Sequence, residues 1–376
     1  MKIVFLCGCL EPGRDGVGDY VRQLAMELLL QGHLATCVAL NDPCIEQEVS
    51  TSLPLSAGAL SLLRLPSAWS AIKRFRKARH WLAHFDPSWV SLQFVPYAFH
   101  AKGLPLFLLK HLHGIIQGRQ VHLMVHESWI GAETGSSVKH RLLSVLQKAI
   151  IIRIIKGIHP AVIHTHLPFY STHIAQLGWR VLPLPLFSNI PVVKRSNNMA
   201  NAIFRVGIFS QADTSRPFLD FLIRLEESLA LCNQVLQILL IGGNASKMRT
   251  LGDFIEEVDS LRNKVHYTGF LEPAQISEAL QSCSLGLTPV PRHALGKSGS
   301  VAAFLSHGIP VAAPNVHNGY SANDIGFFSP NLCSFILLEP DLEHFRIITA
   351  SLPEESEIKI STVAQAFLRD LYTQTI

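Results

Sequence analysis

The tripeptide Gly296-Lys297-Ser298 combines the residue types of a phosphate-binding turn. A lysine can contact an anion with its charge, and the free amides at the start of a helix point donors at the same place. The P-loop of nucleoside triphosphatases also needs a glycine five residues before the first glycine of this tripeptide, and Pro291 stands there. A P-loop is therefore excluded, and a simpler anion site at the start of a helix remains.

Five residues of the second half are candidates to hold that anion. Ser298 has the residue type of a helix N-cap, which would leave the amides of Gly299 and Ser300 without helical partners. The helix dipole contributes only about 0.3 to 1 kcal/mol, so a diphosphate needs charges as well. Lys297 and Arg216 could each supply a charged contact of roughly 1.5 to 3 kcal/mol. The alternative for both is a solvated surface charge.

A second glycine-bearing turn, GVGDY, contains Gly16, Gly18 and Asp19. Glycines let the backbone approach a ligand closely where a strand leads into a helix. The dinucleotide fingerprint needs a third glycine three residues after Gly18, and Val21 stands there, so a nicotinamide cofactor is disfavoured. Gly16 and Gly18 are candidates for a diphosphate and Asp19 for a sugar or acceptor. The alternative is a tight turn without a ligand.

Three polar residues stand at or just beyond the ends of apolar runs in the first half: Gln93, His126 and Glu127. The carboxyl ends of parallel strands share one edge of a sheet, so these side chains could contact a sugar or an acceptor there. His126 is also a candidate catalytic group. The alternatives are a structural histidine satisfied in the core and a solvated glutamate.

Strand-like runs alternate with helical patterns along the chain, as in KIVFLCG, LATCVAL, WVSLQFV, QVHLMVH, FRVGIFS and LQILLIGG. This alternation predicts mostly parallel sheets covered by helices. A stretch rich in proline and asparagine around residue 188 predicts a linker. We therefore expect an α/β fold with two tandem Rossmann-like, doubly wound domains facing a cleft, 1–188 and 189–354. A C-terminal helix over 355–376 is expected to cross back onto the first domain.

The first half of the chain is basic. Residues 1–190 carry 18 Lys and Arg against 10 Asp and Glu, whereas the remainder carries 14 against 18. Lys73, Arg76, Lys77 and His80 share one face of a predicted helix, which suggests peripheral contact with an anionic membrane surface. The alternative is a solvated helix. Nucleic-acid binding is not expected, because no dense basic stripe with interleaved aromatics is present.

Seven cysteines without regular spacing are typical of reduced thiols in a cytoplasmic protein. Cys7 and Cys9 alternate along the first expected strand and are expected in the core, since a zinc site would need more ligands nearby. The start of the chain resembles neither a signal peptide nor an anchor, and Arg153 and Lys156 interrupt the longest apolar run.

Seven segments in order resemble the GT-B retaining glycosyltransferases of the glycogen-synthase-like (glycosyltransferase family four-like) superfamily: GVGDYVRQLA, LQFVPY, VHES, VGIFS, LLIGG, VHYTGFLEPAQISEALQSCSLGLTPV and GKSGSVAAFLSHGIPVAAP. The resemblance covers nearly the whole chain, and the last two segments are the most specific. It implies a nucleotide-sugar donor held mainly by the second domain and an acceptor held mainly by the first. It implies no required metal and no other cofactor.

Carried over residue by residue, the resemblance implies that the backbone of Gly269, Phe270 and Leu271 holds the nucleoside base. It places Gly18 near the donor phosphates and His126 by the transferred sugar. The chain also departs from the family pattern. The family's two glutamates, eight residues apart, fall on Leu295 and Ala303, and its common arginine falls on Gln211, while Arg216 occupies the position of the accompanying lysine.

The expected activity is retaining transfer of a hexose from a UDP-sugar, such as UDP-glucose, to a glycan or lipid-linked acceptor in polysaccharide biosynthesis. Front-face transfer is favoured because no carboxylate nucleophile stands at the family position, and His126, Lys297 and Arg216 are the expected catalytic groups. UDP is favoured because no charged side chain near Phe270 is placed to read a purine. Two alternatives stay open: a catalytically degraded nucleotide-sugar-binding partner protein and a GT-B nucleotide-sugar epimerase.

Overall fold

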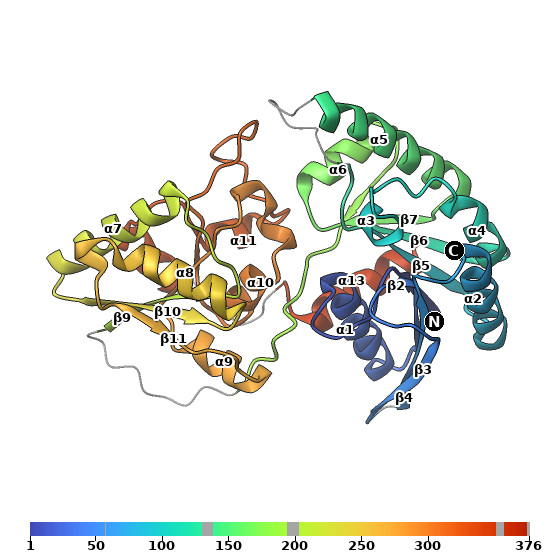
Figure 1. Ribbon diagram of the computed structural model, residues 1–376, viewed down its shortest axis with the longest axis horizontal. Coiled ribbons are helices and arrows are strands. Elements are labelled where there is room, and N and C mark those ends of the chain that lie inside the picture. The colour runs from blue at the N-terminus through green and yellow to red at the C-terminus, as the bar shows by residue number, and fades with distance from the viewer. Residues whose placement is uncertain (57, 130–137, 194–202, 351–356, 374–376) are drawn as a thin grey trace. The chain divides into compact units, whose positions relative to one another are not determined.

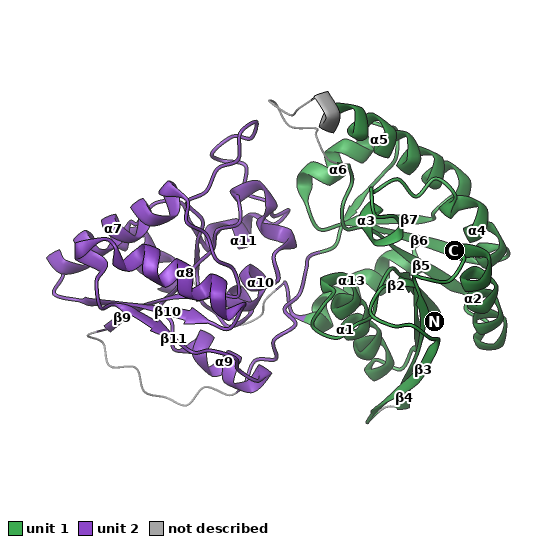
Figure 2. Ribbon diagram, in the orientation of Figure 1, with its two compact units in different colours: residues 1–184, 360–376 green, residues 185–359 purple. Residues whose placement is uncertain are grey.

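The chain folds into two compact units. The computed structural model describes residues 1–56, 58–129, 138–193, 203–350 and 357–373 (Figure 1). Unit 1 comprises residues 1–184 and 360–376, and unit 2 comprises residues 185–359 (Figure 2). The first division falls near the predicted boundary at 188, whereas the second predicted boundary, at 354, lies outside the described residues.

Unit 1 is built around one eight-stranded sheet. Its elements are β1 (Lys2–Cys7), α1 (Gly16–Leu30), β2 (Leu34–Asp42), β3 (Val49–Leu55), β4 (Gly58–Pro66), α2 (Ala71–Phe85), β5 (Trp89–Phe94), α3 (Pro96–Phe99), α4 (Leu108–Ile116), β6 (Gln120–Val125), α5 (Val138–Ile158), β7 (Val162–Thr165), α6 (Pro168–Ala175), β8 (Leu182–Pro183) and α13 (Ile360–Tyr372). The strand order is β3-β4-β2-β1-β5-β6-β7-β8. The order reverses at β1, so the topological switch point, where ligands of such sheets bind, lies between β1 and β5.

The antiparallel pair β3–β4 is the part of unit 1 that the sequence analysis missed. The residues of β3 are partly or fully exposed, so this edge strand lacks the continuous apolar run that identifies buried parallel strands. Cys9 is buried, as predicted, but it does not belong to the first strand. The strand β1 ends at Cys7, and Cys9 lies buried in the loop that follows.

The C-terminal helix α13 belongs to unit 1, as the sequence predicted. Its Phe367 is fully buried and stacks on Phe5 of β1 with ring centroids 5.9 Å apart. The Gln31 side chain at the end of α1 donates to the Ser361 carbonyl at 3.5 Å. Figure 1 shows the red α13 beside the blue α1.

Unit 2 has a six-stranded, fully parallel sheet. Its elements are β9 (Ile203–Phe209), α7 (Arg216–Leu231), β10 (Val235–Ile241), α8 (Ala245–Glu256), η1 (Asp259–Leu261), β11 (Val265–Tyr267), α9 (Pro273–Gln281), β12 (Leu285–Leu287), η2 (Arg292–Lys297), α10 (Gly299–Ser306), β13 (Val311–Ala312), α11 (Pro330–Ser334), β14 (Ile336–Leu337) and α12 (Leu342–Ala350). The order β11-β10-β9-β12-β13-β14 is the 3-2-1-4-5-6 order of a Rossmann sheet, so its switch point lies between β9 and β12.

The helix α10 packs closely on this sheet because the strands carry glycine beneath it. A Cβ atom at Gly286 would lie 2.5 Å from the ring of Phe304, and one at Gly207 would lie 3.0 Å from the same ring. Phe304 is only 1% exposed. The small strand residues therefore set how closely α10 packs on the sheet.

Candidate functional site

The loops after β9 and β12 bring hydroxyl and amide groups together at the switch point of unit 2. Ser298 caps α10, because its Oγ accepts a hydrogen bond from the Val301 amide at 3.4 Å, which confirms the predicted N-cap. The Ser300 Oγ lies 3.0 Å from the Ser298 Oγ and donates to Oε1 of Gln211 at 3.4 Å. Gly299 is the first residue of α10. The start of this helix therefore presents amides and hydroxyls in one place.

Lys297 and Arg216 are the two cations predicted for this site. Lys297 ends η2 and is exposed. Arg216 is the first residue of α7, and its side chain is 76% exposed while its Nε donates to Oδ1 of Asp220 at 2.7 Å. An exposed pair of this kind contributes little free energy. Arg216 can therefore exchange Asp220 for a phosphate group at low cost.

Arg292 holds the loop after β12 in place, and the sequence analysis did not single it out. Its guanidinium donates to three backbone carbonyls, those of Ala313 at 2.8 Å, Ala322 at 2.9 Å and Leu338 at 2.9 Å. These partners come from three later segments, so no local pattern in the sequence points to them. The fixed loop preorganises the residues that lead to Ser298.

The two positions at which the family has glutamates are apolar and buried in unit 2. Leu295 is 1% exposed and Ala303 is 0% exposed, and both belong to the core. Neither position can offer a carboxylate to a ribose or a hexose. Binding of a sugar nucleotide by this unit would therefore depend mainly on contacts to the phosphates and the base.

The predicted base-binding segment follows β11. Gly269 has a φ of +67°, a left-handed conformation that glycine adopts without strain. Phe270 is 87% exposed, whereas Leu271 packs partly against the core. Glu272 and Gln275 then form a capping box at the start of α9. An exposed ring beside a glycine backbone offers a flat apolar surface to a base.

In unit 1, the structure brings two of the predicted residues into direct contact. His126 follows β6, Gln93 lies in the neighbouring β5, and the His126 Nε2 is 2.8 Å from the Gln93 Oε1. Both side chains are buried, and Glu127 beside them is half-buried. The ring of Tyr20 on α1 lies edge-on to His126, with centroids 5.3 Å apart.

A chain of hydrogen bonds continues from Gln93 through the sheet to α13. The Gln93 Nε2 donates to the Ser91 Oγ at 2.7 Å, and this oxygen is 2.7 Å from the His122 Nδ1. The His122 Nε2 is 3.0 Å from the His164 Nδ1, and the His164 Nε2 is 3.1 Å from Oδ2 of Asp370. Five side chains from four elements are thus linked.

The carboxylate at the end of this chain sets the direction of every hydrogen bond, because it only accepts. Asp370 accepts from the His164 Nε2–H, so the other nitrogen of that ring accepts from His122. The second nitrogen of His122 then accepts from the Ser91 hydroxyl, which accepts from the neighbouring glutamine amide. The glutamine carbonyl is left to accept from the His126 Nε2–H. The lone pair of His126 is therefore at Nδ1.

The buried histidines are neutral. Burial lowers the pKa of His126 well below its usual value, and the nearby His166 adds to this shift. Burial also lowers the pKa of His166 to about 4, although its hydrogen bond to the Leu184 carbonyl opposes the shift. At neutral pH His126 can therefore accept a hydrogen bond at Nδ1, but it does not supply a positive charge.

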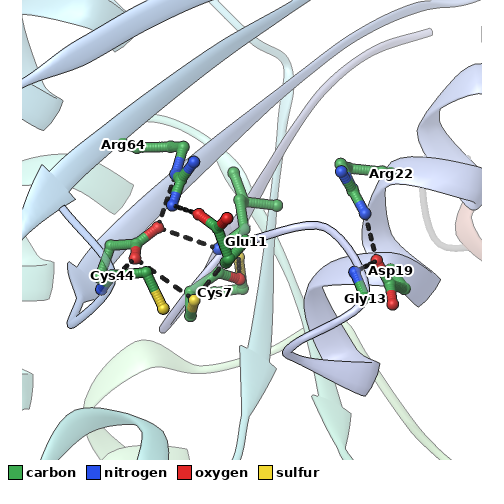
Figure 3. Close-up of polar contacts among 10 residues, drawn as sticks. Cys7, Glu11, Gly13, Asp19, Arg22, Cys44 and Arg64 are labelled. Atoms are coloured by element: carbon green, nitrogen blue, oxygen red, sulfur yellow. Dashed lines mark hydrogen bonds and ion pairs between the residues drawn. The ribbon is translucent and has the colours of Figure 1, made fainter.

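The glycine turn after β1 is held by contacts of its own. Asp15 caps α1 by accepting from the Gly18 amide at 2.7 Å. Asp19 accepts from the Gly13 amide at 3.2 Å and pairs with Arg22 (Figure 3). Both contacts use Oδ1 of Asp19, so this oxygen is already engaged within the turn.

Packing alone requires glycine at position 18. A Cβ atom at Gly18 would lie 2.6 Å from the carbonyl oxygen of Cys9, whereas one at Gly16 would meet nothing within 4 Å. The tight-turn alternative thus accounts for Gly18 without a ligand, and Gly16 remains the more open approach to the helix start.

The predicted site residues lie near the carboxyl edges of the two sheets: Gly16, Gly18, Asp19, Gln93, His126 and Glu127 in unit 1, and Arg216, Gly269, Phe270, Leu271, Lys297, Ser298, Gly299 and Ser300 in unit 2. Hydrogen bonds join Gln93 to His126 and the Ser298 hydroxyl to that of Ser300. The Ser300 hydroxyl also donates to Gln211, which adds this residue to the serine pair in unit 2.

No protein-family model and no curated protein matches the chain. Solved structures match it over its whole length. The sucrose-phosphate synthase of Thermosynechococcus elongatus is 15% identical with a TM-score of 0.60, and the match covers 100% of this chain and 99% of that one. Anabaena Alr3699/HepE, solved in complex with UDP and glucose, is 16% identical with a TM-score of 0.51 and coverage of 100% and 97%.

A UDP-GlcNAc 2-epimerase from Methanocaldococcus jannaschii is 9% identical, with a TM-score of 0.53 and coverage of 99% and 100%. At these identities the comparisons show the fold. The chain has the GT-B fold, with two Rossmann-like domains, which confirms the fold that the sequence resemblance implied.

Proposed function

We propose that the protein is a retaining glycosyltransferase that moves a hexose from a UDP-sugar to a glycan or lipid-linked acceptor in polysaccharide biosynthesis, without a metal. The observation that carries the proposal is the group formed by Ser298, Ser300 and Gln211 at the switch point of a Rossmann sheet, with Lys297 beside it. The whole-length likeness to a sucrose-phosphate synthase and to a protein solved with UDP and glucose supports it.

In this proposal, unit 2 stabilises the leaving diphosphate. Lys297 and Arg216 neutralise the charge that develops on it, and the amides of Gly299 and Ser300 add donors at the start of α10. The family's glutamate positions offer no carboxylate nucleophile. The transfer therefore proceeds on one face of the sugar, and a phosphate oxygen takes the proton of the acceptor hydroxyl as the new glycosidic bond forms and the bond to the phosphate breaks.

Unit 1 contributes the sugar and acceptor contacts in this proposal. The Nδ1 lone pair of His126 accepts a hydrogen bond from a hydroxyl of the transferred sugar, while Gln93 holds the ring in place. Asp19 and Glu127 contact the acceptor. Gly16, at the open start of α1, approaches the donor phosphates.

Titration calorimetry with UDP, GDP and ADP tests the choice of donor. The base site has a backbone edge and the exposed ring of Phe270, with no charged side chain in that segment to read a purine. We expect UDP to bind most tightly. Tighter binding of GDP would overturn the assignment of a UDP-sugar.

Two other functions keep the same fold. The burial of Leu295 and Ala303 at the glutamate positions favours a catalytically degraded nucleotide-sugar-binding partner as the second candidate. An epimerase is the third, since UDP-GlcNAc 2-epimerases share the fold. A partner protein would bind UDP-glucose without releasing UDP, and an epimerase would convert the sugar nucleotide into its epimer.

In the described part of the chain, no helix combines the length and the apolar character that a membrane span requires. We place the protein in the cytoplasm, with peripheral contact at the inner face of the membrane through α2. On this helix, Lys73 lies over the ring of Trp69 at 3.1 Å and Lys77 pairs with Glu48 at 2.9 Å. Arg76 and His80 are exposed.

Co-sedimentation with anionic and neutral vesicles tests this contact. We expect salt-sensitive recovery with anionic vesicles that the variant Arg76→Gln weakens, because each lysine or arginine near the surface contributes about 1 kcal/mol. Equal recovery with both vesicle types would rule out specific contact with an anionic membrane and would favour a soluble glycan as the acceptor.

A further inference from the structure

Two thiols and a buried carboxylate meet where β1 and β2 end. Asp42 is the last residue of β2 and is completely buried, Cys9 lies two residues beyond β1, and Cys44 lies two residues beyond β2. Their ligand atoms all lie within 4.8 Å of one another. The sequence shows too few further ligands near Cys7 and Cys9 and predicts no zinc site. The fold supplies them, because parallel neighbours bring residues 33 positions apart to one edge of the sheet.

We propose that Cys9, Asp42 and Cys44 bind a thiophilic divalent cation such as Zn²⁺ through the two sulfur atoms and Oδ1 of the carboxylate. The Cys9 Sγ lies 3.4 Å from the Asp42 Oδ1. With Zn–S and Zn–O bonds of about 2.3 and 2.0 Å, sulfur and oxygen ligands on a tetrahedral zinc ion lie roughly 3.5 Å apart. This pair is therefore already spaced as one edge of such a site, and a water molecule completes the four ligands.

Surrounding groups orient the carboxylate toward the sulfur atoms. The Asp42 Oδ2 accepts from the Arg64 Nε at 2.7 Å and from the Leu10 amide at 3.2 Å. Oδ1 accepts from the Cys44 amide at 3.0 Å, which holds that residue against the carboxylate. Arg64 therefore binds Oδ2 of Asp42, and Oδ1 lies on the side of the thiols. Outer contacts of this kind hold metal ligands in place.

The charges around the site suit a divalent cation. The Glu11 amide donates to the Cys9 Sγ at 3.3 Å, a contact that stabilises a thiolate. The Glu11 carboxylate pairs with Arg64, which balances the charge of the guanidinium (Figure 3). Binding exchanges the two thiol protons, which leave to solvent, for the ion. The two thiolates and the carboxylate of Asp42 then bind the doubly charged ion.

The ion would fix the loop beneath the glycine turn. The carbonyl oxygen of Cys9 would lie only 2.6 Å from a Cβ atom placed on Gly18, so the Cys9 backbone packs directly against the first turn of α1. A metal bond at Cys9 therefore ties the floor of the first turn of α1 to the end of β2. This structural role is separate from the transfer reaction and does not depend on it.

Cobalt titration of the full-length protein, kept reduced with a phosphine, tests the site. We expect one Co²⁺ per chain with the intense visible bands of tetrahedral coordination and an ultraviolet thiolate charge-transfer band, both lost when Zn²⁺ is added. Cys44→Ser is expected to weaken Co²⁺ binding roughly tenfold or more and to halve the charge-transfer band. Cys232→Ser, at an exposed cysteine of unit 2, is the matched control and is expected to bind as the wild type does.

Circular dichroism of each variant separates loss of the site from loss of the fold. Zn²⁺ is also expected to raise the unfolding temperature of the wild type and of Cys232→Ser, but not of Cys44→Ser, because a ligand that binds only the folded chain stabilises it. A wild-type spectrum of six-coordinate Co²⁺ without a thiolate band would overturn the proposal. Equal binding by wild type and a folded Cys44→Ser variant would do so as well.

Discussion

At the scale of single residues, Lys297 is exposed and stands one residue before the N-cap of α10, so its charge can contact a diphosphate bound there. The second predicted cation, Arg216, pairs with Asp220 but can exchange it for a phosphate at low cost. We therefore predict that Lys297→Ala weakens UDP binding by about 1.5 to 3 kcal/mol, the contribution of a charged hydrogen bond. Calorimetric titration with UDP measures the change.

The matched control for this variant is Arg262→Ala. Arg262 is an exposed cation of the same unit that pairs with Asp259, and it precedes β11, so it lies at the amino edge of the sheet. Its loss is expected to leave UDP binding unchanged. If Lys297→Ala bound UDP as tightly as Arg262→Ala does, the lysine would be a solvated surface charge.

At the scale of elements, Asp370 of α13 is linked to His126 of the candidate site by the chain of hydrogen bonds through β7, β6 and β5. Although burial opposes ionisation of Asp370, hydrogen bonds from His164 and Arg369 lower the pKa of its carboxyl group, so it is an acceptor at neutral pH. We predict that Asp370→Leu lets His126 populate the Nδ1–H form, whereas Asp370→Asn, which keeps an acceptor oxygen, retains the Nε2–H form. Two-bond ¹H–¹⁵N spectra of histidine-labelled protein distinguish the two forms. An unchanged His126 in a folded Asp370→Leu variant would show that the direction of the chain is set elsewhere.

Elements whose residues carry their own signal could be predicted from the sequence. The strands β1, β5 and β6 are mostly apolar and Ser298 has the residue type of a helix N-cap, so the strands and the start of α10 were predicted. Features that depend on partners distant in the sequence could not be predicted in this way. The exposed β3 is defined by its pairing with β4, and Arg292 by carbonyls more than 20 residues away. The chain from Gln93 to Asp370 joins strands and a helix that only the folded sheet brings together.

At the scale of the whole molecule, the buried histidines make stability depend on pH. The unfolded chain takes up a proton on each histidine near pH 6.5, whereas folded His166 does so only at about pH 4. The unfolded state thus binds more protons in this window, and stability falls as the pH is lowered from 6.5 to 4. His166 alone is expected to account for about 3 kcal/mol of this loss. Urea denaturation across the window should show a shallower decline for His166→Asn, whose amide can still donate to the Leu184 carbonyl. A decline as steep as that of the wild type would mean that His166 is not held neutral.

At this scale, slow hydrolysis of UDP-glucose by the purified protein is the decisive test of whether the molecule activates a nucleotide sugar. Activation of the donor needs both the diphosphate contacts of unit 2 and an aligned sugar, but it needs no known acceptor. ¹H NMR follows UDP, the free sugar and its anomeric form in one experiment. We predict slow release of UDP together with α-glucose as the first-formed anomer, reduced in Lys297→Ala and unchanged in Arg262→Ala. Binding of UDP-glucose with no release of UDP, or conversion into an epimeric sugar nucleotide, would contradict the assignment.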